Sequence, residues 1–355
     1  MRVLIVDTYY ASFLSAHYSE RPSLVEEPYE VQWRALMERS FGTSDAYSHF
    51  LATLGHEAHE VVVNSRELQA AWAREHGIRR RLSVRRRRPI VLAQAIEFEP
   101  DVVYVQDLNV LPPKVLIELR KRSRLLVGQI ASEPPSKLQL APFQLILTSF
   151  PHFVSRFREL GIASEYFRIG FDPRVLKRLG DVPHLAGAAF VGALGRSQHS
   201  RGNGLLEQAA RRAPIDFWGY GAEDWPPSSP IRRRYRGEAW GLDMYRVLAG
   251  ARIALNRHID VAGDYANNMR LYEATGVGAL LLTDAKSNLG ELFEPEAEVV
   301  TYASIDELVE KIGHYLANEE ARVQIARAGQ QRTLGTHTYA ERMRELEGIL
   351  VRYLD

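Results

Sequence analysis

Residues 253–284 read IALNRHIDVAGDYANNMRLYEATGVGALLLTD, and this stretch decides the fold class. The apolar run Ile253–Asn256 predicts a strand, Asn268–Thr275 has helical spacing and begins with a helix-capping residue type, and Ala279–Leu282 predicts a second strand. Such a strand–helix–strand unit joins two parallel strands by a right-handed connection. Strands that are apolar along their whole length indicate a parallel sheet covered by helices on both faces.

The same alternation continues through the rest of the chain. In the second half it predicts strands at Ala188–Val191, Asp216–Trp218 and Val299–Thr301. In the first half it predicts strands at Val3–Val6, His59–Val63, Val102–Val105, Leu125–Val127 and Leu145–Leu147, with a helix over Glu30–Leu54 that stops at Gly55. We therefore expect an α/β protein with two doubly wound, Rossmann-like domains, at residues 1–180 and 181–335. Residues 336–355 are expected to form a terminal helix that closes the second domain or crosses back onto the first.

The composition excludes several classes of protein. The chain has 355 residues, no cysteine and a formal charge of +1. Without cysteine there is no disulfide scaffold, Cys-ligated metal site or thiol nucleophile. The apolar stretch at the N-terminus, Val3–Val6, is too short for a signal-peptide core, which favours a cytoplasmic protein.

The two halves of the chain differ in net charge, although the whole chain is close to neutral. Residues 1–180 hold 25 Lys and Arg against 20 Asp and Glu, whereas residues 181–355 hold 20 against 24. Much of the first excess comes from the run Arg79–Arg88, which is either a solvated loop or a contact for an anionic surface such as a membrane face. The run lacks interleaved aromatic residues, so nucleic acid is not an expected partner.

Polar residues gather where the strand at 253–256 ends and the next helix begins. Asn256 and His258 follow the strand, and Asn267 and Asn268 precede the helix. The free N–H groups at a helix start suit a diphosphate, and Arg270 adds a cation in the first turn. Glu273 lies three residues further on and could accept both hydroxyls of a ribose. The alternative is a capped surface helix with an ordinary Arg–Glu pair.

A second candidate is the glycine-rich turn Gly192–Arg196, which follows the first strand of the second half. Its backbone could approach a phosphate that Arg196 and Arg201 would neutralise. The turn matches neither a dinucleotide-binding fingerprint nor a P-loop, so a simple strand–helix turn is the alternative.

Several motifs together resemble the donor-binding half of the GT-B glycosyltransferases, and most of all the group-1-like branch that contains the CgeB spore-maturation family. The C-terminal motifs are Asn268–Gly276, Ala279–Asp284, Leu289–Phe293, Ser304–Leu308, Ile325–Gly329 and His337–Arg342. Weaker matches in the first half are Val103–Asp107, Leu126–Gln129 and Ile169–Pro173.

The resemblance implies two facing domains, with a nucleotide-sugar donor bound by the second and an acceptor by the first. It also implies a reaction that needs neither a metal nor a resident cofactor. Glu273 matches the family's ribose-binding glutamate, and the loop Tyr235–Glu238, with Gly237 and Glu238, matches the segment that meets the base. Many relatives have a second glutamate eight residues earlier, where this chain has Tyr265.

An inverting transferase needs a base beside the acceptor hydroxyl, whereas a retaining one can do without. In this fold the loop after the first strand faces the cleft, so Asp7 and His17 are candidates, with Glu133 as a third. Asp107 also stands at a strand end. For each residue a capping or salt-bridging role is the alternative.

The sequence thus predicts a metal-independent glycosyltransferase with an unidentified acceptor. The alternatives are a sugar-nucleotide epimerase on the same fold and an inactive nucleotide-binding protein. Because Glu273 is expected to face the cleft, Glu273→Ala should weaken nucleotide binding and leave the fold intact.

Overall fold

The computed structural model describes residues 1–78, 90–182, 184–185, 187–196 and 200–355. The chain divides into two compact units, one formed by Met1–Arg168 with Arg342–Asp355 and the other by Ile169–Glu341. The first unit therefore ends at Arg168 rather than at residue 180, and it recovers the end of the chain. No helix in the described ranges is long and apolar enough to cross a membrane.

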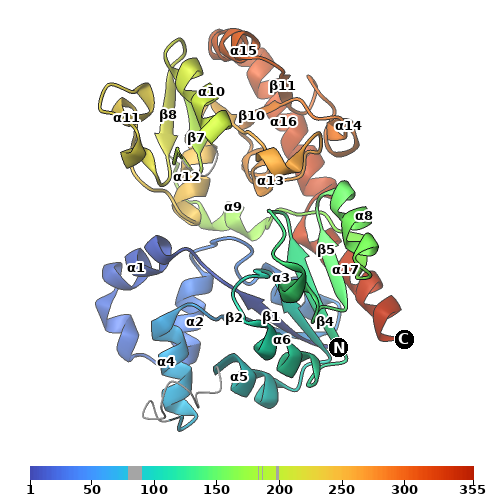
Figure 1. The fold of residues 1–355 in the computed structure, drawn as a ribbon. Coiled ribbons are helices and arrows are strands. Elements are labelled where there is room, and N and C mark those ends of the chain that lie inside the picture. Colours follow the sequence, from blue (N-terminus) through green and yellow to red (C-terminus); the bar gives the residue numbers. More distant parts are fainter. Residues whose placement is uncertain (79–89, 183, 186, 197–199) are drawn as a thin grey trace. The chain divides into compact units, whose positions relative to one another are not determined.

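Unit 1 is built on a parallel sheet of six strands in the order β2-β1-β3-β4-β5-β6. The strands are β1 (Arg2–Asp7), β2 (Glu57–Val62), β3 (Val102–Val105), β4 (Leu125–Ile130), β5 (Leu145–Thr148) and β6 (Ala163–Tyr166). The flanking helices are α1 (Ala11–Glu20), η1 (Pro22–Glu26), α2 (Tyr29–Met37), α3 (Ala46–Thr53), α4 (Arg66–Glu75), α5 (Ile90–Phe98), α6 (Pro113–Arg120), α7 (Lys137–Leu140) and α8 (Pro151–Glu159). They lie on both sides of the sheet (Figure 1). β6 is an additional strand that the apolar pattern did not indicate.

The helix expected over Glu30–Leu54 is interrupted. α2 ends at Met37 and α3 begins only at Ala46. Between them Ser40, Gly42 and Ser44 have φ values of 52°, 59° and 48°, in the left-handed region that ends a right-handed helix. The helical spacing holds on either side of this turn, and the prediction of one continuous helix is wrong.

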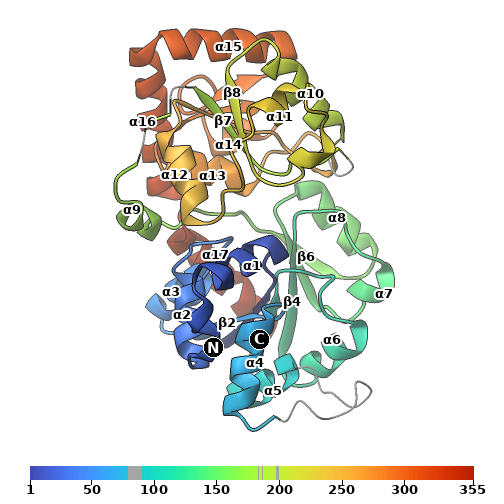
Figure 2. The same cartoon turned by 90° about the vertical axis from the view of Figure 1, so that its left-hand side faces the viewer.

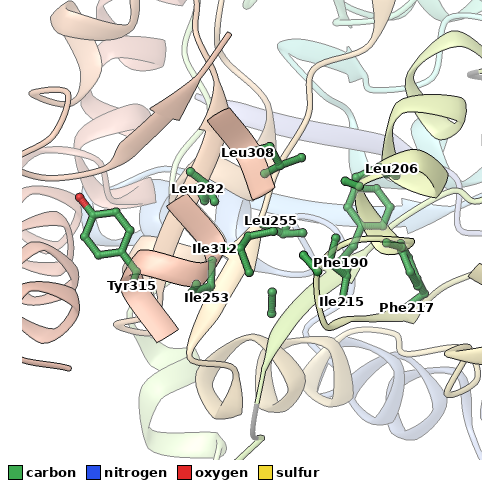
Figure 3. Packing of buried hydrophobic residues seen from close by; sticks show 14 of the residues in the cluster. Phe190, Leu206, Ile215, Phe217, Ile253, Leu255, Leu282, Leu308, Ile312 and Tyr315 are labelled. Carbon is green, nitrogen blue, oxygen red and sulfur yellow. The ribbon is translucent and has the colours of Figure 1, made fainter. Parts of the chain in front are cut away.

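Unit 2 repeats the plan with five parallel strands in the order β11-β10-β9-β7-β8. The strands are β7 (Ala188–Val191), β8 (Ile215–Trp218), β9 (Ile253–Leu255), β10 (Leu280–Asp284) and β11 (Val300–Tyr302). The helices are α9 (Arg174–Arg178), α10 (Ser200–Ala210), η2 (Ala222–Asp224), α11 (Pro230–Arg233), α12 (Leu242–Gly250), η3 (Asp260–Ala262), α13 (Met269–Gly276), α14 (Leu289–Leu292), α15 (Ile305–Ala317) and α16 (Glu319–Thr336). One cluster of buried side chains forms the core of unit 2. In it Phe190 of β7 and Ile253 of β9 lie together with Leu206 of α10 and Ile312 of α15 (Figure 3).

Helix starts follow local capping rules. The hydroxyl of Ser304 accepts from the backbone N–H of Glu307, and the Glu307 carboxylate accepts from the N–H of Ala303. These two contacts, a variant of the capping box in which the carboxylate accepts from the residue before the cap, begin α15 where the sequence has Ser-x-x-Glu. The last helix, α17 (Tyr339–Leu354), starts in unit 2 and belongs to unit 1 from Arg342 onward (Figure 2). Within unit 1 its Glu347 contacts the ring of His56 at 2.8 Å, which agrees with a helix that crosses back.

Candidate functional site

The strand order of unit 2 creates a position where neighbouring loops diverge. After β7 the chain builds β8 on one side of β7, and it then returns to build β9 on the other side. The carboxyl ends of β7 and β9 are therefore adjacent, while the segments that leave them run in different directions. Ligands of open parallel sheets bind at such a switch point.

The loop that leaves β7 is held tightly against the loop that follows β8. Gly192 donates its N–H to the carbonyl of Trp218 at 3.0 Å. A Cβ on Gly219 would stand 1.9 Å from the carbonyl oxygen of Gly192, so only glycine permits this approach. The amide of Asn203, in the first turn of α10, donates to the carbonyl oxygens of Ala193 and Gly195. These contacts give the turn a fixed shape beside the switch point.

Of the two arginines expected beside this loop, only Arg196 has a described side chain. The backbone N–H of Arg196 donates to the carboxylate of Asp224, and its exposed guanidinium lies 5.4 Å from the ring centre of Trp225. Arg201 falls in α10, and its side chain lies outside the described part of the structure.

Two asparagines join the end of β9 to the start of α13. The side chains of Asn256 and Asn268 exchange hydrogen bonds of 3.2 and 2.9 Å, and Asn256 also donates to the Thr283 hydroxyl at 3.0 Å. Asn268 caps α13 by accepting from the backbone N–H of Leu271. Asn267 is fully buried and accepts from the Tyr272 hydroxyl, so its contact is internal. The amide pair fixes the helix start against the strand end.

Arg270 and Glu273 form an ion pair with each other. The Arg270 guanidinium lies 2.8 Å from a Glu273 carboxylate oxygen, and it also donates to the carbonyl of Val191 at the end of β7. Glu273 is only 5% exposed, and this burial raises the pKa of its carboxyl group, although Arg270 opposes the shift. That Glu273 faces the donor cleft stays a prediction.

The strand pattern alone did not identify Arg257 as a candidate donor-binding residue. Its guanidinium donates to the carbonyl of His258 at 3.2 Å and to the side-chain oxygen of Asn203 at 3.4 Å, while its Nε is buried without a hydrogen-bond partner. It lies against the first turn of α10, where a Cβ on Gly202 would fall 1.7 Å from a guanidinium nitrogen. Arg270 and Lys286 both have carboxylate partners, whereas none of the ion pairs in the described ranges includes Arg257.

His258 is clamped by the end of the neighbouring strand. Its ring Nδ1 and its backbone N–H both contact the same carboxylate oxygen of Asp284, at 2.7 and 3.0 Å. Burial raises the pKa of Asp284, but the hydrogen bonds and charge of His258, together with Lys286, outweigh burial and lower the pKa overall. The other ring nitrogen, Nε2, is buried and has no hydrogen-bond partner.

The predicted base-binding loop runs beside the end of β8. The Tyr235 hydroxyl donates to the carbonyl of Gly219, and Gly237 accepts from the N–H of Gly219. The exposed carboxylate of Glu238 accepts from the indole N–H of Trp240 at 2.7 Å. The loop is therefore anchored to the same glycine that supports the β7 turn.

Unit 1 has a polar cluster at its own switch point, between β1 and β3. The Thr8 hydroxyl donates to the Asp107 carboxylate at 2.9 Å, and the Thr8 backbone N–H donates to Asp7 at 2.7 Å. Burial raises the pKa of Asp7 to about 7; the Thr8 hydrogen bond opposes this shift and the charge of Asp107 adds to it. The Asn64 side chain makes two hydrogen bonds to the Tyr9 backbone, which holds the loop in place.

The other two candidate bases have different surroundings. His17 is fully buried in α1, and neither ring nitrogen has a hydrogen-bond partner. Burial and the nearby Arg39 and Arg21 lower its pKa to about 4, so its ring is neutral at pH 7. Glu133 is exposed and lies 3.9 Å from the guanidinium of Arg156.

Two further expectations concern metal and surface binding. No three His, Asp or Glu side chains in the described ranges gather closely enough to hold a metal ion. The arginine run Arg79–Arg88 lies outside the described residues.

Comparison with known proteins bears on the fold. Residues 196–348 match the family model described as "Glycosyl transferase-like". HepE of Anabaena, solved with UDP-glucose, superposes with a TM-score of 0.62 at 12% identity, covering 99% of this chain and 100% of that one. The chain has the GT-B fold. A glycosyltransferase from Rickettsia africae gives a TM-score of 0.60 at 10% identity, covering 100% and 98% of the two chains. Sucrose-phosphate synthase of Thermosynechococcus elongatus gives 0.58 at 10% identity, covering 99% and 98%. No curated protein matches the sequence.

Some of the predicted donor-binding residues lie together in the structure. Asn256, His258, Asn268 and Arg270 come together around the ends of β7, β9 and β10. Arg257 belongs to the same group, and its place directly after an apolar strand is the sequence signal that could have singled it out.

Proposed function

We propose that this GT-B protein transfers a hexosyl group from a nucleotide-sugar donor, held by unit 2 without a metal ion, to an acceptor held by unit 1. The observation that carries the proposal is Arg257, whose guanidinium lies at the switch point of the second sheet and has no carboxylate partner among the described residues. A partly buried cation without a counterion favours an anionic ligand, because the ligand's charge offsets the cost of its desolvation. The capped start of α13 supports the same ligand, since its free N–H groups favour a phosphate.

The diphosphate is assigned to Arg257 in preference to Arg270. Arg270 already contacts Glu273 and the Val191 carbonyl, so binding a phosphate there would compete with existing contacts. Within the described ranges the Arg257 guanidinium donates only to two neutral oxygens. A fixed guanidinium stabilises the negative charge that grows on the leaving diphosphate, a role that a metal ion has in other transferases.

Asp7 is the proposed base on the acceptor side. Its carboxyl group lies at the end of β1, and its pKa of about 7 suits proton removal near neutral pH. Placement of the protein in the CgeB-like branch rests on the C-terminal motifs, and membrane contact through Arg79–Arg88 stays a separate prediction.

The test of donor binding is a melting-shift screen with nucleoside diphosphates and their sugars, beginning with UDP and UDP-glucose because HepE was solved with both ligands. We expect at least one nucleotide sugar to raise the melting temperature with or without EDTA. Arg257→Gln should reduce this shift, whereas Arg212→Gln, which alters an exposed ion pair with Asp306 in the same unit, should not.

Product analysis then separates the classes of reaction. Slow release of free sugar from the bound donor supports transfer, whereas interconversion of two nucleotide sugars would identify an epimerase instead. A chain that no nucleotide stabilises would contradict the proposal.

A further inference from the structure

Among the described residues, only one of the two ring nitrogens of His258 has a hydrogen-bond partner. Nδ1 contacts Asp284 at 2.7 Å, and His258 as a whole is 3% exposed. Nε2 has no protein partner and no exposed surface. Buried polar atoms in native proteins nearly always have a partner, so an unused one at the ligand-binding edge of a sheet needs an explanation.

The contact with Asp284 occupies Nδ1 and leaves Nε2 for a ligand. The Asp284 carboxylate is an acceptor, and therefore Nδ1 carries the ring proton and donates to it. A hydroxyl group both donates and accepts, so it can pair with Nε2 whether or not that nitrogen carries a proton.

His258 stands next to the residue that we assign to the diphosphate. It follows Arg257 directly, and its backbone carbonyl accepts from the Arg257 guanidinium at 3.2 Å. The part of a nucleotide sugar that adjoins the diphosphate and carries several hydroxyl groups is the sugar. We propose that Nε2 of His258 forms a hydrogen bond with one hydroxyl of the donor sugar, and that Asp284 is the positioning residue that holds the ring for this contact.

The inference rests on the proposed function, and it adds a determinant of sugar specificity. Because the ring has so little exposed surface, the chain around it must shift when the sugar binds. A buried polar atom that pairs with a hydroxyl discriminates strongly against sugars that lack this hydroxyl, since the atom would then stay without a hydrogen-bond partner.

The decisive variants are His258→Asn and His258→Gln. The asparagine amide can replace Nδ1 and keep the contact with Asp284 while it removes Nε2, and the glutamine side chain can reach the place of Nε2. We expect His258→Asn to weaken binding of the nucleotide sugar by roughly 10- to 100-fold, as the loss of one buried hydrogen bond predicts. Its affinity for the free nucleoside diphosphate should stay within about threefold of the wild type, and His258→Gln should recover part of the loss.

The role of Asp284 is tested by the ratio of the affinity for the nucleotide sugar to the affinity for the free nucleoside diphosphate. Asp284→Asn keeps an oxygen for the Nδ1 proton and should retain the preference for the nucleotide sugar over the nucleoside diphosphate. Asp284→Leu removes this oxygen and should lower the preference. A purely structural role would weaken both ligands equally.

Deoxy analogues of the donor sugar give an independent measurement on the wild-type protein. One deoxy position should reduce affinity about as much as His258→Asn does, and it should have little further effect in that variant. Equal losses for both ligands in His258→Asn, or tight binding of every deoxy analogue by the wild type, would overturn the inference. A wild-type chain that binds no nucleotide sugar would contradict the proposed function itself, so the two failures are distinguishable.

Discussion

Arg270 and Glu273, two residues expected to bind different parts of a donor, are paired with each other at 2.8 Å. Their side chains are only 15% and 7% exposed, so the pair is largely removed from water. Breaking a buried pair from one side leaves an uncompensated charge, which costs more than the pair contributes. Glu273 therefore supports the fold of α13 whether or not it also contacts a ribose.

This relationship changes the expected behaviour of Glu273 variants. Glu273→Ala should lower the free energy of unfolding by roughly 3 kcal/mol, because the Arg270 guanidinium loses its buried partner. Urea denaturation measures the effect, and Asp243→Ala, which breaks the exposed pair with Arg246, should cost less than about 1 kcal/mol. Equal stability of Glu273→Ala and the wild type would show that Arg270 is solvated. Nucleotide affinity is better tested with Glu273→Gln, which keeps a hydrogen-bond acceptor for Arg270.

Gly202 offers a test of Arg257 that leaves the arginine in place. In Gly202→Ala the new methyl group would fall 1.7 Å from the guanidinium, which must move away. We expect donor affinity to fall about tenfold, the loss of one charge-assisted contact, while stability changes little because alanine favours the helix. Gly204→Ala is the matched control, since it lies in the same helix and a Cβ there meets nothing within 4 Å. Titration calorimetry with the nucleotide sugar distinguishes the two variants, and identical affinities would argue against a phosphate site at Arg257.

Asp7 predicts how the transfer rate depends on pH. A base must be ionised to accept a proton, so the rate should rise with pH through a midpoint near the pKa of about 7. Asp7→Asn should reduce the rate by roughly 10²- to 10⁴-fold and leave donor affinity unchanged. Glu133→Gln, at the exposed alternative candidate, should keep the wild-type rate. A fast Asp7→Asn variant would favour a mechanism without a protein base.

Glu60 predicts how stability depends on pH. This residue of β2 is 1% exposed and accepts from the backbone N–H of Ser48 in the first turn of α3. Burial raises its pKa from 4.5 to about 8, and hydrogen bonds from Ser48 only partly oppose the shift.

The pKa of Glu60 is higher in the folded protein than in the unfolded chain. Its contribution to the free energy of unfolding is therefore complete below pH 4.5 and is lost as the pH rises to about 8. Between pH 6 and pH 8 this amounts to roughly 2–3 kcal/mol, at about 1.4 kcal/mol per pH unit. Glu60→Gln cannot ionise and should flatten the decline, which thermal unfolding at several pH values would measure. An unchanged pH profile in this variant would show that Glu60 ionises freely in the folded protein.

The amino-acid sequence by itself determined the local structure and the class of fold. Strand and helix periods depend on neighbours a few residues apart, and for this reason the unit from Ile253 to Asp284 could be predicted as a strand, a helix and a strand. The cap at Asn268 followed from the same local rules. The break between Met37 and Ala46 was missed because serines in the left-handed region carry no periodic signal.

Only the tertiary structure decided which polar groups are paired, buried or unused. The strand order puts the end of β9 between those of β7 and β10, and this order decides that His258 meets Asp284 from 26 residues further along the chain. It also leaves Arg257 without a carboxylate partner in the described ranges. In unit 1, the packing of α1 buries His17 completely. Such contacts depend on which segments become neighbours after folding, and the energy of a charged or polar group depends on that environment more than on its place in the sequence.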